Sequence, residues 1–552
     1  MQLRVVAHQA SFKIGDLSGN AKKIIQLYSE SNCDLVVFPE LCLTGYNCRD
    51  LFLDSYFISE IEKYILEIAK YVNDKALLIG APTKEGGGLF NSAILLKNGK
   101  IENIYHKYFL PNDAVFDEKR YFQAGDKLSS IFQLNGYKMR IMICEDIWHS
   151  EAELYNPDEV CELAVIINAS PYAINKTNKR KQLLKDFSRK YNYKYVIYVN
   201  LVGAEDHLVF DGGSMVLFDN QVINTTKWRE GSITLYNEGV SSDFSGKYNL
   251  GSTRNLSIGN IHYNEEVSDI FNLNDEAASD IYNGIILALR EYSNYAGCDQ
   301  VVIGLSGGID SALVAVIAVD AFGPEKVLCV AMPSKYSSQS SMNDASELVK
   351  RIGCQLEVIP INQIKSTFDS ILQPTLDVLS DNELTNENLQ PRIRATILMA
   401  IANKQQRLLL CTSNKSESAV GYSTLYGDMT GAYGPIVDIY KTQVYALCRW
   451  RNRLSDIIPE TIMEKEPSAE LRPNQKDSDS LPAYKCLDKI LYHLIELREI
   501  PKGFDQLLVE RVKSLLFKSE FKRFQSPPGP KVNSVMLSTD RRYPISIKLN
   551  FQ

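Results

Sequence analysis

The sequence predicts two α/β domains in tandem, separated by a polar connector. Its 552 residues exceed the roughly 100–250 residues that one domain usually holds, so two or three domains are expected. In both halves, short apolar runs rich in β-branched residues alternate with helical stretches. Between residues 241 and 276 the sequence becomes polar and weakly periodic, as in a linker. We therefore expect domains at residues 1–240 and 277–552, with a connector at residues 241–276.

In the first domain the expected strands are short and lie between turn residues. They are Leu35–Phe38, Ala76–Gly80, Ser92–Leu96, Met139–Ile143, Ala164–Asn168, Tyr195–Asn200 and Met215–Phe218. Helical stretches between them indicate a layered α/β domain. One of these stretches, Lys176–Lys190, is basic, but acidic and apolar residues interrupt it, which is typical of an exposed helix face.

The second domain is expected to begin with a helix at Ala277–Tyr292. Buried strands should follow at Gln300–Leu305, Lys326–Met332, Gln355–Pro360 and Arg407–Thr412. Strands that alternate with helices in this way predict a doubly wound, mainly parallel sheet. Beyond Leu481 we expect a helix, then the proline-rich stretch Ser526–Pro530, then strand-like sequence.

Composition and charge exclude several classes of protein. A net charge of −7 argues against a surface that binds nucleic acid. The most apolar long window, Val301–Val319, is interrupted by Ser306-Gly307-Gly308 and Asp310, so no membrane span is expected. The N-terminus has no export signal, and the eleven cysteines show no CxxC spacing. We therefore expect a cytoplasmic protein with reduced thiols.

A phosphate-binding loop is expected after the first strand of the second domain. The strand Val301–Leu305 runs directly into Ser306–Ser311, whose sequence is SGGIDS, and then into an apolar helix. Its two glycines let backbone N–H groups and the helix N-terminus converge on an anion, and its two serines can donate hydroxyl bonds. The loop lacks the lysine of a Walker A sequence.

The hexapeptide resembles the pyrophosphatase loop of the ATP-pyrophosphatase families. These enzymes cleave ATP between its α- and β-phosphates to activate a carboxyl or carbonyl group as an adenylate. The resemblance implies that Asp310 helps to hold Mg²⁺ on the departing pyrophosphate. It implies ATP contacts for Gly304, Leu305, Ser306, Gly307, Gly308, Ile309, Asp310 and Ser311.

Further blocks resemble the NAD synthetase family. They are residues 332–338, 385–394, 411–417, 420–428 and 467–471. The resemblance implies that Thr412 contacts ATP, that Asn388, Glu417 and Lys531 bind deamido-NAD, and that Glu417 also reaches magnesium. Cations are needed beside so many phosphates, and the candidates are Arg392, Arg394, Lys415, Lys441 and Lys531. Pro391 departs from the small non-proline residue usual in the family, which puts the local helix start in doubt.

Three separate motifs in the first domain supply a carboxylate, an ammonium and a thiol. Glu40 lies at the end of a strand, Lys107 follows His106, and Cys144 follows Ile143. A free thiol is a poor nucleophile at neutral pH, so a carboxylate base must take its proton and an ammonium must stabilise the oxyanion. This set resembles the nitrilase-type amidase triad, with Glu40 as base, Lys107 as oxyanion stabiliser and Cys144 as nucleophile.

Two other segments of the first domain also resemble this superfamily. Glu118 resembles the second acidic residue that orients the lysine. Ser170 and Lys176 resemble the segment that binds glutamine, whereas Asp113 occupies a position where the family often has an aromatic residue. A side-chain contact from Asp113 to glutamine is therefore not expected.

Taken together, the two halves resemble the glutamine-dependent NAD synthetases. The implied fold is a nitrilase-like αββα layered domain followed by a doubly wound, Rossmann-like parallel-sheet synthetase domain. The amidase would hydrolyse glutamine to glutamate and ammonia. The ammonia would attack adenylated deamido-NAD and give NAD, AMP and pyrophosphate. Mg²⁺ is the expected cofactor, ATP a co-substrate, and a homo-oligomer, either a dimer or larger, the expected assembly.

Two alternatives stay open at the level of sequence. One is another ATP-pyrophosphatase amidotransferase, such as a GMP or asparagine synthetase. Those enzymes use different glutaminases, and the asparagine synthetase of the glutamine type needs a cysteine immediately after the initiator Met, where this chain has Gln2. The other is a nucleotide- or glutamine-sensing pseudo-enzyme, which would have lost a catalytic side chain.

Overall fold

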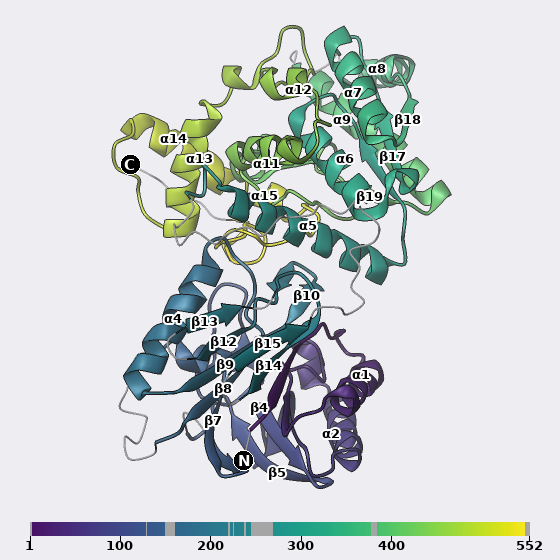
Figure 1. Cartoon of the computed structure of the whole chain (residues 1–552). Coiled ribbons are helices and arrows are strands. Elements are labelled where there is room, and N and C mark those ends of the chain that lie inside the picture. Colours follow the sequence, from purple (N-terminus) through teal and green to yellow (C-terminus); the bar gives the residue numbers. More distant parts are fainter. Residues whose placement is uncertain are drawn as a thin grey trace. The chain divides into compact units, whose positions relative to one another are not determined.

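The computed structural model divides into two compact units, Met1–Asn249 and Leu250–Gln552 (Figure 1). It describes residues 3–127, 130–149, 160–218, 221–224, 226–236, 239–243, 269–376 and 383–546. Of the expected connector, residues 241–243 belong to a strand, and residues 244–268 lie outside the described residues. None of the helices in the described part is long and apolar enough to cross a membrane.

The first unit contains two large sheets and a hairpin, β10 (Val202–Glu205) with β11 (Leu208–Asp211). Among the described residues, one sheet has the order β15-β14-β1-β2-β3-β4-β5 and the other the order β13-β12-β9-β8-β7-β6. The strands of the first sheet are β1 (Val5–Gln9), β2 (Leu35–Val37), β3 (Ala76–Glu85), β4 (Gly88–Lys97), β5 (Lys100–His106), β14 (Gly231–Tyr236) and β15 (Gly239–Asp243). Those of the second are β6 (Ser130–Leu134), β7 (Tyr137–Ile143), β8 (Leu163–Asn168), β9 (Tyr195–Asn200), β12 (Met215–Phe218) and β13 (Gln221–Asn224).

The first unit also contains helices, some of which cover the outer faces of its two large sheets. They are α1 (Leu17–Glu30), η1 (Arg49–Leu53), α2 (Ser55–Lys70), α3 (Glu118–Tyr121), η2 (Cys144–Ile147) and α4 (Lys176–Tyr191). Helices α1 and α2 cover the outer face of the first sheet and α4 that of the second. Strand β8 shows the layering, because Val165 packs into the core shared with the first sheet and Ile166 packs into the core beneath α4. Helices α1 and α2 close the other side through Ile24 and Ile61. The expected αββα layers and all seven expected strand regions are confirmed.

The second unit is built on one parallel sheet with the order β18-β17-β16-β19. Its strands are β16 (Val301–Gly304), β17 (Val327–Ala331), β18 (Gln355–Val358) and β19 (Leu408–Leu410). Val301, Val302 and Ile303 alternate between the two faces of β16 and are all fully buried, so helices cover both faces. The doubly wound sheet and its four expected strands are confirmed.

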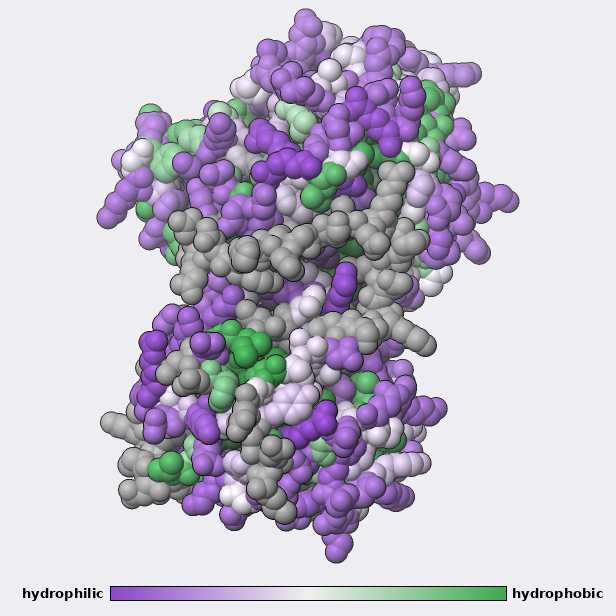
Figure 2. All heavy atoms as spheres, viewed as in Figure 1, coloured by the Kyte–Doolittle hydropathy of each residue, from purple (hydrophilic) through white to green (hydrophobic). Residues whose placement is uncertain are grey.

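The second unit also contains helices, which lie on both faces of this sheet and in a separate group (Figure 1). They are α5 (Asp275–Ala296), α6 (Ile309–Phe322), η4 (Pro324–Lys326), α7 (Gln339–Ile352), α8 (Asn362–Leu376), α9 (Glu383–Gln405), α10 (Lys415–Val420), α11 (Lys441–Leu454), α12 (Glu460–Glu464), η5 (Asp477–Asp479), α13 (Tyr484–Tyr492), the π-helical turn η6 (His493–Leu497), α14 (Gln506–Lys518) and α15 (Glu520–Arg523). Helices such as α6 and α9 cover the faces of the sheet, and the separate group lies around α13 and α14. On the face seen in Figure 2, hydrophilic side chains cover most of the described surface of both units.

Three local expectations need correction. Pro391 lies inside α9, which begins at Glu383, so the proline does not set the helix start. The strand-like sequence after Pro530 forms no strand up to residue 546, and its last residues, 547–552, lie outside the described part of the chain. The basic helix α4 is not simply an exposed face, because Arg180 is completely buried. An ion pair with Asp211 makes that burial possible.

Candidate active sites

The first unit brings Glu40, Lys107 and Cys144 together. Each residue lies just beyond the C-terminal end of a strand: Glu40 after β2, Lys107 after β5, and Cys144 after β7 in the opposite sheet. Their exposed fractions are 0%, 1% and 8%. The three motifs, far apart in the sequence, therefore form one buried cluster.

Hydrogen bonds hold the carboxylates of this cluster in fixed positions. The Lys107 ammonium donates to Glu40 Oε1 at 2.7 Å and to Glu118 Oε1 at 2.8 Å. Asn91 Nδ2 donates to Glu40 Oε1 at 2.8 Å, and the backbone N–H of Ala169 donates to Glu40 Oε2 at the same distance. Glu118 thus joins the cluster as the sequence predicted, while Asn91 is a member that no motif indicated.

The electrostatics of the cluster keep the thiol protonated at rest. Burial, followed by the charge of Glu40, raises the pKa of Cys144 well above its usual value, and Lys107 opposes this only in part. Burial alone would lower the pKa of Lys107, but Glu118 and Glu40 outweigh it and raise that pKa well above the ordinary one. A protonated thiol and an ammonium therefore lie in one buried site beside the side chains of Glu40 and Glu118.

Asp146 links the segments that carry Cys144 and Lys107, and no sequence motif indicated this residue. Its carboxylate accepts the backbone N–H groups of the two residues after Lys107, at 3.1 and 2.9 Å, and of the residue before Cys144, at 3.0 Å. The Tyr105 hydroxyl donates to the same carboxylate at 2.6 Å. One buried side chain therefore links the chain segments of both predicted catalytic residues.

The predicted glutamine-binding residues lie on the same side of the second sheet. Ser170 follows β8, which pairs in parallel with β7, so Ser170 and Cys144 leave the sheet at the same edge. Ser170 is buried and its backbone N–H donates to Asn200 Oδ1 at 2.9 Å. Lys176 opens α4, with its Nζ atom 6.0 Å from the centre of the Trp148 ring. Asp113 is exposed.

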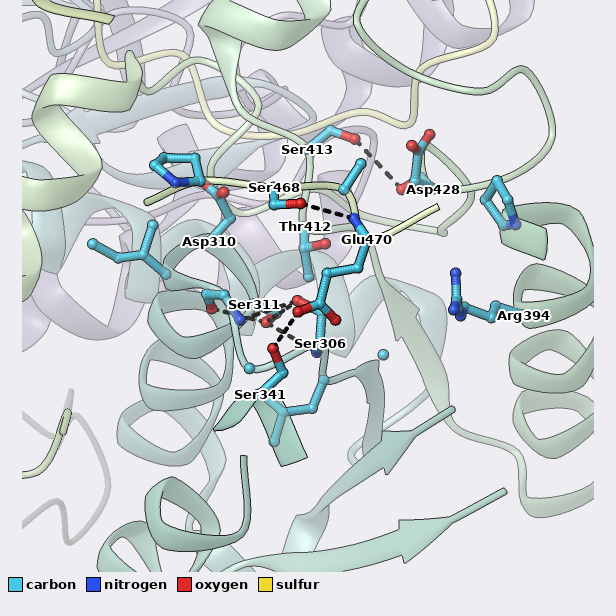
Figure 3. Close-up of a pocket in the computed structure, with 18 of the residues that line it drawn as sticks. Ser306, Asp310, Ser311, Ser341, Arg394, Thr412, Ser413, Asp428, Ser468 and Glu470 are labelled. Carbon is cyan, nitrogen blue, oxygen red and sulfur yellow. Dashed lines mark hydrogen bonds between the residues drawn. The ribbon is translucent and has the colours of Figure 1, made fainter. Parts of the chain in front are cut away.

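The second unit contains a cavity of about 290 Å³ that is lined by the whole SGGIDS loop (Figure 3). Gly304–Ser311 and Thr412, which are predicted to contact ATP, line it, and so does Glu417, which is predicted to bind deamido-NAD and magnesium. Gly307 has a φ of 79°, and a Cβ atom there would lie 2.2 Å from the carbonyl oxygen of Ser341. Only glycine fits this turn, which leaves the loop backbone open towards the cavity.

The two carboxylates expected at magnesium share one ammonium. Lys441 Nζ contacts the carboxylate of Asp310 and lies 2.8 Å from Glu417 Oε1, while Asn414 Nδ2 donates to Asp310 Oδ1 at 3.0 Å. Burial raises the pKa of Asp310 to about 6, against the opposing effect of Lys441. Mg²⁺ is commonly held by one or two carboxylates together with phosphate oxygens and water, so this donor set fits the ion.

The candidate cations divide into two groups. Arg394 and Lys441 line the cavity, and burial lowers the pKa of Arg394 to about 10. Lys415 is completely buried and pairs with Asp438 at 2.8 Å and Glu496 at 2.6 Å. The expectation that Lys415 meets the substrate phosphates is therefore wrong, because two carboxylates already hold its ammonium outside the cavity.

Two of the predicted deamido-NAD residues lie away from this cavity. Among the described residues, its lining includes neither Asn388 nor Lys531. The Thr424 hydroxyl donates to Asn388 Oδ1 at 2.8 Å. Lys531 is buried, pairs with Asp540 at 2.7 Å and donates to the carbonyl oxygen of Asn533 at 3.1 Å. Arg392 donates to a backbone carbonyl instead of facing the cavity.

A segment with no role assigned from the sequence also lines the cavity. Glu470, in the block at residues 467–471, accepts hydrogen bonds from the hydroxyls of Ser338 at 3.0 Å and Ser341 at 2.6 Å. Figure 3 shows its side chain crossing the cavity towards Ser341 and the SGGIDS loop. Lys465 contacts the Ser341 hydroxyl. The matching of this block to the family was the only sequence signal for these contacts.

Comparisons with known proteins cover the whole chain. A family described as carbon-nitrogen hydrolase matches residues 4–236, and one described as NAD synthase matches residues 281–526. The glutamine-dependent NAD(+) synthetase of Aquifex aeolicus is 39% identical over 99% of both chains. The one from Acinetobacter baylyi is 38% identical over 98% of both chains.

Solved structures agree with these sequence matches. The glutamine-dependent NAD+ synthetase from Acinetobacter baumannii, in complex with adenosine diphosphate, superposes with a TM-score of 0.75 at 34% identity. The match covers 99% of this chain and 98% of that one. The enzyme from Cytophaga hutchinsonii shows the same fold, with a TM-score of 0.79 at 20% identity over 99% and 98% of the two chains. The chain therefore belongs to the glutamine-dependent NAD(+) synthetase family.

Proposed function

We propose that the two sites of this chain divide the synthesis of NAD between them. The amidase site releases ammonia from glutamine, and the synthetase site uses ATP and that ammonia to amidate deamido-NAD. One observation carries the assignment of residues. A complete Glu–Lys–Cys cluster is buried in one unit, and a cavity lined by the SGGIDS loop lies in the other.

In the amidase, Cys144 Sγ attacks the side-chain amide carbon of glutamine while Glu40 accepts the thiol proton. The amide oxygen becomes an oxyanion, and the Lys107 ammonium stabilises it. The raised pKa of Lys107 keeps this charge in place throughout. Glu40 returns the proton to the leaving nitrogen, so ammonia departs and a thioester remains. Water activated by Glu40 then hydrolyses the thioester to glutamate.

In the synthetase, the carboxylate of deamido-NAD attacks the α-phosphorus of ATP, and pyrophosphate leaves. The backbone N–H groups of the SGGIDS loop and the hydroxyls of Ser306 and Ser311 hold the phosphates, and Thr412 contacts ATP. Asp310 and Glu417 would hold Mg²⁺, which neutralises the charge of the departing pyrophosphate when it is bound. Ammonia then attacks the activated acyl carbon and AMP leaves.

The deamido-NAD contacts of Asn388, Glu417 and Lys531 are proposed from the family resemblance. The amide nitrogen of Asn388 can donate to the substrate while its oxygen stays bonded to Thr424. Glu417 reaches the substrate from the cavity wall. Lys531 can bind deamido-NAD only by exchanging the partners that now hold its ammonium.

Purified chain supplied with deamido-NAD, ATP and Mg²⁺ should form NAD with either glutamine or ammonium as nitrogen donor. A dehydrogenase-coupled assay for NAD measures both rates. A pseudo-enzyme would bind the substrates without forming NAD, and another amidotransferase would leave deamido-NAD unused. For the assembly and location we propose a cytoplasmic homo-oligomer, which light scattering and cell fractionation would test.

A further inference from the structure

A fully buried arginine lies beneath the predicted glutamine site. Arg180, on α4, has an exposed fraction of 0%, and its Nη1 atom donates to Asp211 Oδ1 at 2.8 Å. Its Nη2 atom faces three oxygens: the carbonyl of Ser170 at 2.7 Å, the hydroxyl of Ser170 at 3.2 Å and the carbonyl of Pro171 at 3.1 Å. The nitrilase-type triad does not use this guanidinium.

The hydrogen bond to Ser170 Oγ has a definite direction. A guanidinium carries only donors, so the Ser170 hydroxyl must accept this bond, and its own proton is left to donate either to a substrate or to the neighbouring buried Tyr198 hydroxyl. The backbone of Ser170 is fixed as well, because Arg180 holds its carbonyl and Asn200 holds its N–H. Asn200 Nδ2 also donates to that carbonyl at 3.1 Å. Ser170 therefore presents a hydrogen-bond donor of set position and polarity.

Asp211 completes the arrangement. It is fully buried at the end of β11 and orients the guanidinium, and the Thr177 hydroxyl lies 3.3 Å from its second carboxylate oxygen. Removal of either partner of a buried ion pair leaves an uncompensated charge, so the two residues act as a unit. Arg180 is also close enough to Cys144 for a thiolate there to raise the arginine's pKa.

We propose that Arg180 and Asp211 are positioning residues of the amidase, which orient the Ser170 hydroxyl as a donor to the α-carboxylate of glutamine. At the amino-acid end of glutamine the ammonium only donates and the carboxylate only accepts. The Arg180 cation beside Ser170 Oγ disfavours a second cation at this point, so the serine proton meets the carboxylate. Arg180 touches Ser170 and not the substrate. This inference rests on the proposed function of the amidase site.

The test is a double-mutant cycle between Arg180→Lys and Ser170→Ala. Both substitutions preserve size closely, and a lysine retains a charge for Asp211. A hydrogen bond to a charged group typically contributes about ten- to a hundredfold in affinity, so each single variant should raise the KM for glutamine by about that factor, with kcat within about threefold. Because Arg180 acts through Ser170, the glutamine KM of the double variant should exceed the higher of the two single-variant KM values by no more than about threefold.

Two measurements separate positioning from damage to the fold. Alkylation of Cys144 by iodoacetamide, followed by peptide mass spectrometry, probes the nucleophile with an amide that lacks an amino-acid end, and its rate should stay within about twofold. Ammonia-supported NAD synthesis should not change. Arg189→Lys, on the same helix with its side chain 62% exposed, is the matched control and should leave the glutamine KM unchanged. Asp211→Asn should reproduce the effect of Arg180→Lys.

The inference is overturned if the two single effects multiply in the double variant, or if Cys144 alkylation slows in parallel with glutamine hydrolysis. A different result would overturn the proposed function itself. If Cys144→Ala still supported synthesis from glutamine, the amidase assignment would fail whatever the cycle showed. The two failures are therefore distinguishable.

Discussion

The amidase cluster and the synthetase cavity handle charge in opposite ways. Lys107, Glu40 and Glu118 are at most 3% exposed and pair only with one another and with neighbouring groups of the chain. The synthetase cavity is open, and Lys441 holds together the two carboxylates that are proposed to bind Mg²⁺. The amidase cluster balances its charged side chains within the protein, whereas the synthetase cavity is suited to substrates that bring their own charges.

The substrates explain the difference. The amide of glutamine is neutral, so the amidase must supply every charge of its transition state and hold these charges in advance. ATP and deamido-NAD carry their own phosphates, so the synthetase needs donors, cations and space. A charge removed from the first site should therefore lower turnover directly. Removal of a charged side chain from the synthetase site should instead change the rate through its effect on ATP and magnesium.

The largest expected effect separates the two sites completely. Cys144→Ala should reduce glutamine-supported NAD synthesis by at least about 10⁴-fold, the usual result of deleting a nucleophile, and should leave ammonia-supported synthesis within about twofold. Both rates come from the same coupled assay on one preparation. Loss of both activities in a folded protein would contradict the division of labour.

Asp310→Asn tests the synthetase site. Without this carboxylate, Mg²⁺ on the departing pyrophosphate loses a ligand, which is expected to cost several kcal/mol of barrier, or about a thousandfold in adenylation. Pyrophosphate release measures that step. Glutamine hydrolysis, measured as glutamate formed, should continue. Unchanged NAD synthesis at ordinary magnesium concentration would remove Asp310 from the proposed metal site.

Lys415 offers a structural counterpart to Lys107. It too is fully buried between two carboxylates, Asp438 and Glu496, but it lies outside the cavity. Lys415→Met should therefore lower the free energy of unfolding of the synthetase unit by about 3–5 kcal/mol, since both carboxylates lose their partner. Differential scanning calorimetry measures this, with exposed Lys350→Met as the control. An unshifted transition would show that the cluster is not essential for stability.

Lys107→Arg should act more strongly on turnover than on stability. An arginine keeps the charge, but its broad planar group cannot occupy the place of a compact ammonium beside the oxyanion. We expect glutaminase turnover to fall about a hundred- to a thousandfold, equal to roughly 3–4 kcal/mol, with ammonia-supported synthesis nearly unchanged. The larger side chain in this buried site should lower the stability of the first unit by about 1–3 kcal/mol. Glutamine hydrolysis within a few-fold of the unmodified chain would show that Lys107 does not stabilise the oxyanion.

The parts of these sites that the sequence predicted are the local ones. The SGGIDS loop is a single segment between a strand and a helix, so its position followed from its neighbours. Glu40 and Cys144 each follow a strand that the sequence predicted, whereas Lys107 follows β5, which was not among the expected strands. Chemistry explains why the three belong together. The layered folds were predictable for a similar reason, because strand and helix periodicity is written along the chain.

The parts that could not be predicted depend on contacts between distant segments. In the sequence, nothing distinguishes Asp146 from other acidic residues. Its role depends on hydrogen bonds that its carboxylate accepts from the two backbone N–H groups after Lys107. Arg180 belongs to a basic stretch whose other charges are mostly exposed, and only its pairing with Asp211 distinguishes it. Lys415 looked like a phosphate ligand because its burial and its partners are not visible in the sequence.

The position of β1 in its sheet determines when the first unit can finish folding during synthesis on the ribosome. This strand pairs with β2 on one side and with β14 on the other, where Val6 lies opposite Thr234. At about 5–20 residues per second, β1 must wait roughly ten to fifty seconds for its second neighbour. Throughout that interval one edge of the strand stays open to pairing with other chains. The first sheet of the amidase unit can therefore be completed only when translation reaches the connector. At that point most of the synthetase unit has not yet been made.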